Sequence, residues 1–244
     1  MDERHQPMMA YARDIQVSAA DGGEFSAYLA VPGTPNGSVL VVLQEIFGVN
    51  MNIRSIVDGF AADGYVAIAP DLYWRQESGV QLDPSREADR NKAMLLNSKL
   101  DQNQAVADAG AAIAAARSYA SVTASAVAVG YCLGGKLAYL MAARGLVKAA
   151  VSYYGVGIQG ALDEAANIEG RVLLHIAEKD TLCPPEAQQK IRAALSLLGS
   201  RGIVVTHPDV GHAFARGGGA SFNAEATARA NTLTREFLEV AAMR

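Results

Sequence analysis

The feature that most constrains the fold is a series of short, almost unbroken apolar runs separated by longer stretches with helical spacing. Runs of this kind are typical of strands covered on both faces, as in a parallel sheet between two layers of helices. Strands that alternate with helices indicate βαβ units with right-handed crossovers. We therefore predict an α/β fold with a mostly parallel, doubly wound sheet. Its strands are expected at residues 39–43, 66–69, 126–129, 149–153, 172–176 and, more weakly, 203–206.

The stretches between these runs carry helical signals. Apolar residues at 53, 56, 57 and 60 are spaced for one face of a helix, with Asn52 as its N-cap and Gly64 just beyond its end. Asp83-Pro84 is expected to open a second helix, because proline suits the first helical position. Further helices are expected over residues 104–120, from 185 to 199, and over 224–241.

The first thirty residues have a different pattern. Residues 15–18 and 25–31 flank the turn sequence Ala20-Asp21-Gly22-Gly23, which predicts an antiparallel hairpin. A hairpin at the edge of a doubly wound sheet is a common start for such a fold. No internal repeat, linker or low-complexity tract divides the chain, so residues 1–244 are expected to form one domain.

Composition argues against several classes of protein. Half of the 244 residues are apolar and 19% are charged, which supplies a sizeable core and excludes intrinsic disorder. The net charge of −4 and the lack of a basic block argue against a nucleic-acid partner. The charged N-terminus precedes no apolar segment, and the uncharged stretch 118–135 is too rich in serine and glycine to span a membrane. We expect a cytoplasmic protein without a membrane partner.

Two cysteines, Cys132 and Cys183, are too few for a disulfide framework and fit a reducing compartment. Ligands at the spacing of a structural zinc site are missing as well. Cys132 is the more informative of the two, because Gly130-Tyr131-Cys132-Leu133-Gly134 follows an apolar strand and precedes a helix. In the G-x-S-x-G elbow this position exposes a nucleophile on a strained turn.

The helix that follows the elbow favours a thiolate at Cys132, and the Leu133 N–H points at the same place, where it can serve as an oxyanion donor. The alternative is a buried structural cysteine in a glycine-rich turn. We predict the nucleophile because the strand, the elbow and the helix occur together.

A nucleophile of this kind needs a base and a carboxylate that orients the base. Along the chain, the three residues are expected in the order nucleophile, acid and histidine. Asp180, which follows the strand at 172–176, and His212, which follows the strand at 203–206, fit this order. The alternative for Asp180 is a cap on the helix that Pro184-Pro185 opens. The other histidines, His5, His175 and His207, are expected to be surface or hydrogen-bonded residues.

The loop after the strand at 39–43 begins Gln44-Glu45-Ile46. A loop at this place supplies the second oxyanion donor in the hydrolase plan, so the Ile46 N–H is the candidate. A carboxylate at the end of an apolar strand must have a partner. Glu45 is therefore either braced by a salt bridge or a site carboxylate near Cys132, where its charge disfavours the thiolate until substrate arrives.

Five motifs together resemble the dienelactone hydrolase family, the carboxymethylenebutenolidases, and they span nearly the whole chain. The resemblance implies an α/β-hydrolase fold with a Cys132–His212–Asp180 triad that needs no cofactor or metal. It also implies that Glu45 contacts the resting cysteine and that Arg216 and Arg90 bind the carboxylate of a small lactone substrate. The motifs are residues 44–50 (QEIFGVN), 69–73 (APDLY), 130–135 (GYCLGG), 153–157 (YYGVG) and 211–216 (GHAFAR).

Two positions depart from the family pattern. Met94 stands where a tyrosine is usual, and Ala213 follows the histidine where serine is frequent. Met94 removes a hydroxyl from the expected substrate pocket, which leaves the choice of lactone open. A carboxylesterase or thioesterase with uncharged substrates is one alternative, and the arginine pair argues against it. A non-catalytic binding module is another, and the intact triad argues against that. The oligomeric state is open, and a monomer is compatible with the sequence.

Overall fold

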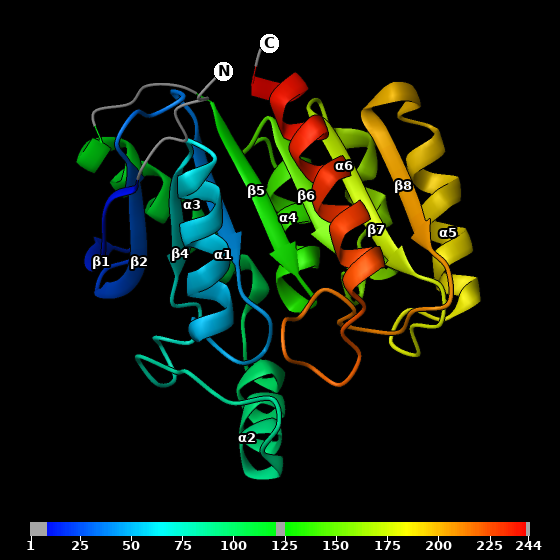
Figure 1. Cartoon of the computed structure of the whole chain (residues 1–244), viewed down its shortest axis with the longest axis horizontal. Coiled ribbons are helices and arrows are strands. Elements are labelled where there is room, and N and C mark those ends of the chain that lie inside the picture. The colour runs from blue at the N-terminus through cyan, green and yellow to red at the C-terminus, as the bar shows by residue number, and fades with distance from the viewer. Residues whose placement is uncertain (1–8, 121–124, 243–244) are drawn as a thin grey trace, which may run out of the picture.

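The computed structural model describes residues 9–120 and 125–242, which contain an eight-stranded sheet in the order β1-β2-β4-β3-β5-β6-β7-β8 (Figure 1). β1 and β2 form an antiparallel hairpin, β2 pairs antiparallel with β4, and every other pairing is parallel. The predicted α/β fold with a mostly parallel sheet and an N-terminal hairpin is confirmed. The strands are β1 Met9–Ser18, β2 Glu24–Pro32, β3 Val39–Leu43, β4 Val66–Pro70, β5 Ala126–Tyr131, β6 Ala149–Tyr153, β7 Arg171–Ala177 and β8 Gly202–His207.

Helices cover both faces of this sheet. α1 and α6 pack on one face, α3, α4 and α5 on the other, and α2 projects beyond the end of the sheet (Figure 1). The strands read as unbroken apolar runs because both faces are buried under these layers. The helices are α1 Met51–Ala62, α2 Glu87–Ser98, α3 Gln102–Ala120, α4 Leu133–Ala143, α5 Pro185–Ser196 and α6 Ala224–Ala242, with short 3₁₀ helices at Ile158–Gly160, Leu162–Asn167 and Gly199–Arg201.

Two predicted helix starts are wrong. The N-cap of α1 is Asn50, whose side-chain oxygen accepts the Ile53 N–H at 3.3 Å, and Asn52 lies inside the first turn. Asp83-Pro84 does not open α2, which begins at Glu87. The Asp83 carboxylate instead accepts the backbone N–H and the hydroxyl of Ser85, at 2.9 and 2.8 Å, and this local turn holds the chain out of the helix.

Of the three histidines expected to be surface or hydrogen-bonded residues, two are fully buried and hydrogen-bonded, and His5 lies outside the described residues. His175 on β7 and His207 on β8 are joined through Nδ1 and Nε2 at 3.0 Å. The other nitrogen of His175 lies 3.0 Å from Thr234 Oγ1 on α6, and that hydroxyl lies 2.8 Å from the Tyr153 hydroxyl. This chain of hydrogen bonds ties α6 to the ends of three strands.

Burial, with the charges of His207 and Arg229 adding to its effect, lowers the pKa of His175 to about 3. Burial also lowers the pKa of His207 to about 4, with Arg229 adding to the effect. Both imidazoles are therefore neutral in the folded protein at neutral pH. A protonated ring in this place would be a buried cation without a carboxylate partner in the chain of hydrogen bonds.

The buried histidine pair predicts a loss of stability in acid. In the unfolded chain each imidazole has a pKa of about 6.5, so the unfolded state binds more protons than the folded state below that pH. As the pH falls from 7 to 5, the free energy of unfolding is expected to drop by about 2 kcal/mol for each histidine. Urea unfolding of the His207→Gln variant should show a drop about 2 kcal/mol smaller. Equal drops in the variant and the parent would contradict a neutral buried pair.

Candidate active site

Cys132 lies on a sharp turn between β5 and α4, as the sequence predicted. Its backbone has φ 55° and ψ −114°, a region that side-chain-bearing residues rarely adopt. The Cys132 N–H donates to the Tyr153 carbonyl at 3.0 Å, and α4 begins at the next residue, Leu133. Strain at this position is held in place by the surrounding structure, as in a nucleophile elbow.

Two glycines of the elbow are sterically required. A Cβ on Gly130 would lie 1.9 Å from the Gly134 carbonyl oxygen, and a Cβ on Gly134 would lie 2.2 Å from the Leu43 carbonyl oxygen. Both contacts are with backbone, which cannot move aside without displacing a strand or the helix. The G-x-C-x-G spacing therefore allows the helix to start directly above β3 and β5.

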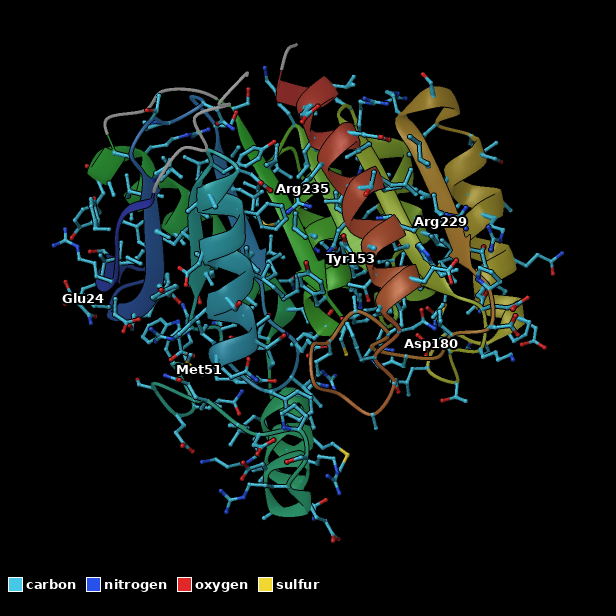
Figure 2. All side chains as sticks on the ribbon, viewed as in Figure 1. Glu24, Met51, Tyr153, Asp180, Arg229 and Arg235 are labelled. Atoms are coloured by element: carbon cyan, nitrogen blue, oxygen red, sulfur yellow. The ribbon has the colours of Figure 1, made fainter. Side chains whose placement is uncertain are left out.

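Asp180 lies just beyond the C-terminal end of β7 (Figure 2) and holds His212. Its Oδ2 is 2.8 Å from His212 Nδ1, and its Oδ1 accepts the Leu182 N–H at 2.9 Å. The alternative role of Asp180 as a helix cap is wrong, because Pro184 is the N-cap of α5 and no side chain caps that helix. The contact with Asp180 leaves Nε2 of His212 for the cysteine.

His212 has hydrogen-bonding partners on both sides. Burial lowers its pKa, but hydrogen bonds to Asp180 and to the Cys132 side chain outweigh that effect and raise the pKa to about 10. An imidazolium is thus stabilised between the carboxylate and the sulfur. A cation in this position stabilises a neighbouring thiolate, which is the reactive form of a cysteine.

Tyr154 also lies at the site, and sequence reasoning assigned it no role there. Its ring meets His212 edge to face at a centroid distance of 5.2 Å, and it meets Phe214 at 5.4 Å. Burial raises the pKa of Tyr154 well above its usual value, and the charge of Glu45 adds to the effect. The available sequence signal was the motif at residues 153–157, where Tyr154 directly follows an apolar strand and precedes glycine. The structure adds that Tyr154 has φ 41°.

Glu45 and Arg216 form a buried, bidentate ion pair. Glu45 is 2% exposed, and its two oxygens accept Arg216 Nε at 2.7 Å and Nη2 at 2.9 Å. The guanidinium also lies 5.0 Å from the centre of the Phe47 ring. Burial lowers the pKa of Arg216, but the Glu45 contacts outweigh this and raise it above its usual value. Both carboxylate oxygens are taken up by Arg216, and no hydrogen bond joins Glu45 to Cys132 among the described residues.

The two predicted oxyanion donors are free to bind a ligand. Neither the Leu133 N–H nor the Ile46 N–H donates to an acceptor within residues 9–120 and 125–242. The loop that carries Ile46 is held to the elbow by the Gly134 N–H, which donates to the Gln44 carbonyl at 3.0 Å. The Tyr73 hydroxyl donates to the Ile46 carbonyl at 3.2 Å. Donors fixed in this way can stabilise an oxyanion without first reorganising.

A family model described as the dienelactone hydrolase family matches residues 25–242. The chain belongs to the dienelactone hydrolase family. It is 37% identical over 226 residues to the carboxymethylenebutenolidase of Pseudomonas putida, covering 92% of this chain and 94% of that protein. It is 44% identical over 230 residues to an Azospirillum brasilense protein that is provisionally named carboxymethylenebutenolidase. The match covers 93% of this chain and 97% of that protein.

Solved structures agree with the assignment to this family. A crystal structure from Klebsiella pneumoniae, described provisionally as a dienelactone hydrolase, has a TM-score of 0.80 at 29% identity and covers 92% of this chain and 96% of that one. A dienelactone hydrolase-like phosphotriesterase from metagenomic libraries has a TM-score of 0.76 at 19% identity, which supports the α/β-hydrolase fold alone. The protein is therefore a hydrolase that acts on lactone or ester bonds.

Arg90 lies apart from this dienelactone hydrolase site. It is exposed on α2, and its guanidinium donates to the carbonyls of Pro84 and Ser85 at 3.0 and 2.8 Å. Met94, one turn further along, is 56% exposed. No contact of Arg90 with the Cys132–His212–Asp180 group is present among the described residues, so its part in substrate binding stays a prediction.

Across residues 9–120 and 125–242, no three or more His, Cys, Asp or Glu side chains are grouped so that they could hold a metal ion. No helix in this part of the chain combines the length and the apolar character that crossing a membrane requires.

Proposed function

We propose that this hydrolase opens a small enol-lactone that carries a carboxylate, such as dienelactone, to give maleylacetate through an acyl-enzyme on Cys132. The observation that carries the proposal is the buried ion pair of Glu45 and Arg216. Arg216 is close enough to Cys132 for their charges to interact, so an anionic group of the substrate would be bound beside the sulfur. The sequence motifs that resemble the dienelactone hydrolase family also imply a small lactone substrate with a carboxylate.

Binding begins with an exchange of partners at Arg216. The substrate carboxylate forms charge-assisted hydrogen bonds with the guanidinium and displaces Glu45 from its bidentate contact. The Phe47 ring beneath the guanidinium supports Arg216 during this exchange. Glu45, deprived of its cation, is then available to accept the proton of the Cys132 thiol. Arg90 stays a second candidate for the carboxylate, by resemblance alone.

Acylation follows at the elbow. The sulfur of Cys132 attacks the lactone carbonyl carbon, and the Leu133 and Ile46 N–H groups hold the oxygen as it becomes negative. The ring C–O bond breaks as the carbonyl reforms, and the electron pair leaves on an enolate. A resonance-stabilised enolate needs little help from a proton donor, which suits a thiolate nucleophile. Acylation consumes the anionic sulfur beside His212, and the imidazolium gives its proton to the departed enolate. His212, now neutral and oriented by Asp180, takes a proton from the water that hydrolyses the thioester.

The test compares two substrates on the purified enzyme. We expect kcat/KM for dienelactone to exceed that for p-nitrophenyl acetate by at least about 30-fold, because a buried charge pair contributes about 2–5 kcal/mol. A neutral ester that is hydrolysed as fast as the lactone would instead make the protein a carboxylesterase or thioesterase. We further propose a cytoplasmic enzyme, compatible with a monomer, that uses neither a nucleic-acid nor a membrane partner.

A further inference from the structure

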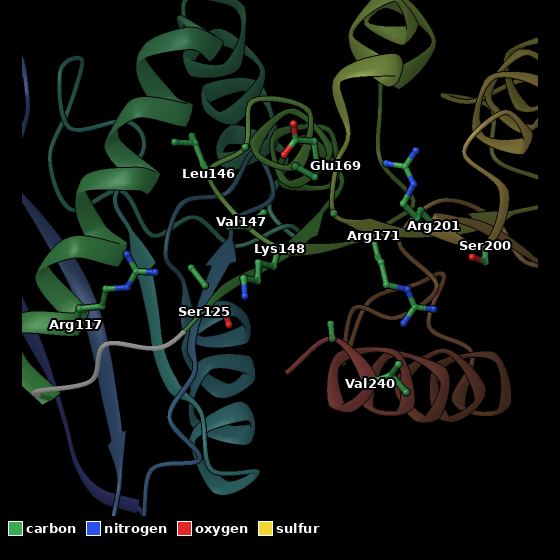
Figure 3. Close-up of a pocket in the computed structure, with 15 residues that line it drawn as sticks. Arg117, Ser125, Leu146, Val147, Lys148, Glu169, Arg171, Ser200, Arg201 and Val240 are labelled. Carbon is green, nitrogen blue, oxygen red and sulfur yellow. The ribbon is translucent and has the colours of Figure 1, made fainter. Parts of the chain in front are cut away.

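A cavity of about 780 Å³ lies at the end of the sheet opposite Cys132 (Figure 3). Its wall is formed by the residues that enter the parallel strands, including Ser125 and Ala126 at the start of β5. Cys132 follows the other end of β5, about 20 Å away at the usual rise per residue. The cavity is therefore separate from the catalytic centre, and its volume is in the range of small-molecule sites.

The lining of this cavity is cationic, although the whole chain carries a net charge of −4. Glu169 is the single carboxylate among the described residues that line the cavity. The cationic side chains come from four segments that are distant in sequence, so they surround the space instead of following one helix. They are Arg117, Lys148, Arg171 and Arg201.

Arg171 is the residue that indicates a ligand. Its guanidinium lies 5.0 Å from the centre of the Phe237 ring, and its Nη1 is buried without a hydrogen-bond partner among the described residues. A buried cationic N–H without an acceptor is costly and rare. The guanidinium lines the cavity, so a small rotation would bring this N–H to an anionic oxygen bound there.

Lys148 and Arg201 extend the positive surface. Lys148 is exposed at the entrance to β6 and forms no ion pair with any described residue. Arg201 donates to the Ile168 carbonyl, which fixes its position at the rim. Figure 3 shows Lys148 and Arg171 extending from neighbouring strand ends, with Val240 of α6 near Arg171. Separated cationic groups around one space match a ligand with more than one anionic group.

We propose that this cavity binds a small polyanion, a molecule with two or more phosphate or carboxylate groups, at a site distinct from the catalytic one. The Arg171 guanidinium turns its unpartnered N–H toward one anionic group while it stays over the Phe237 ring. The Lys148 ammonium binds a second group. The cavity thereby gives a function to a part of the fold that the hydrolysis reaction does not use.

Calorimetric titration of the full-length protein with inorganic pyrophosphate, and separately with citrate, tests the proposal at constant ionic strength. We expect at least one of the two to bind at a single site below millimolar concentration, and the preferred one identifies phosphate or carboxylate as the ligand chemistry. Arg171→Met, which keeps an aliphatic chain over Phe237, should weaken binding at least tenfold. Lys148→Met should weaken it as well, which covers the case that the first variant folds poorly.

Lys190→Met is the matched control, because Lys190 is an exposed lysine on α5 and its loss changes the net charge equally. This variant should bind like the parent protein. Binding that Arg171→Met and Lys148→Met leave unchanged, but that Arg216→Met removes, would place the anion in the catalytic site and overturn the proposal. Failure of both anions to bind at millimolar concentration would overturn it too.

Discussion

Replacing Cys132 with alanine is expected to lower kcat/KM for the lactone by at least about 10³-fold, whereas Cys183→Ala should retain most of the activity. Both cysteines are buried, with 7% and 3% of their surface exposed, so burial does not distinguish them. The surroundings of the two cysteines distinguish them. Cys132 lies on the strained elbow in contact with His212, while burial raises the pKa of Cys183 to about 11, with the charge of Asp180 adding to this effect.

Cys132→Ser provides a sharper comparison than alanine. A hydroxyl depends on its base for activation far more than a thiol does, so the serine variant should also be slow although its shape is nearly unchanged. Circular dichroism of each variant checks that the elbow still folds. Mass spectrometry during turnover of a slow substrate should find the acyl group on Cys132. Equal losses of activity in the Cys132 and Cys183 variants, with folding intact, would contradict the assignment.

Much of the fold could be predicted because the strands are buried on both faces. Six apolar runs correspond to β3 to β8, and the Gly22-Gly23 turn correctly marked the hairpin of β1 and β2. The errors lie at helix starts, where a single side-chain hydrogen bond decides the outcome. Asn50 and Asn52 are equally suitable N-caps by type, and only the path of the chain after β3 selects the first.

The site was predictable to the extent that it follows chain order. The elbow located Cys132, and the strand ends then located Asp180 and His212, which are joined at 2.8 Å. Glu45 and Arg216 are 171 positions apart, so no local pattern could show that they bind each other. The same holds for the packing of Tyr154 against His212, which depends on how the loops after β6 and β8 come together.

Arg216→Met should separate substrate binding from stability. We expect KM for a carboxylate lactone to rise by about 30-fold or more, because a charge-assisted pair contributing about 2–5 kcal/mol is lost, while KM for a neutral ester stays nearly constant. The same change leaves Glu45, 2% exposed, without its cation. Removing one member of a buried ion pair costs about 3–5 kcal/mol of folding free energy.

The double variant Glu45→Gln, Arg216→Met decides between these two effects. Glutamine carries no charge, so the free energy of unfolding should recover most of what Arg216→Met loses, whereas KM for the carboxylate lactone should stay high. Urea unfolding and steady-state kinetics on the four proteins of this cycle provide the measurement. If KM recovers together with stability, Arg216 acts only by bracing Glu45. If the lactone and the neutral ester are affected in parallel, the substrate carboxylate does not bind at Arg216, and the exchange of partners proposed for Glu45 is wrong.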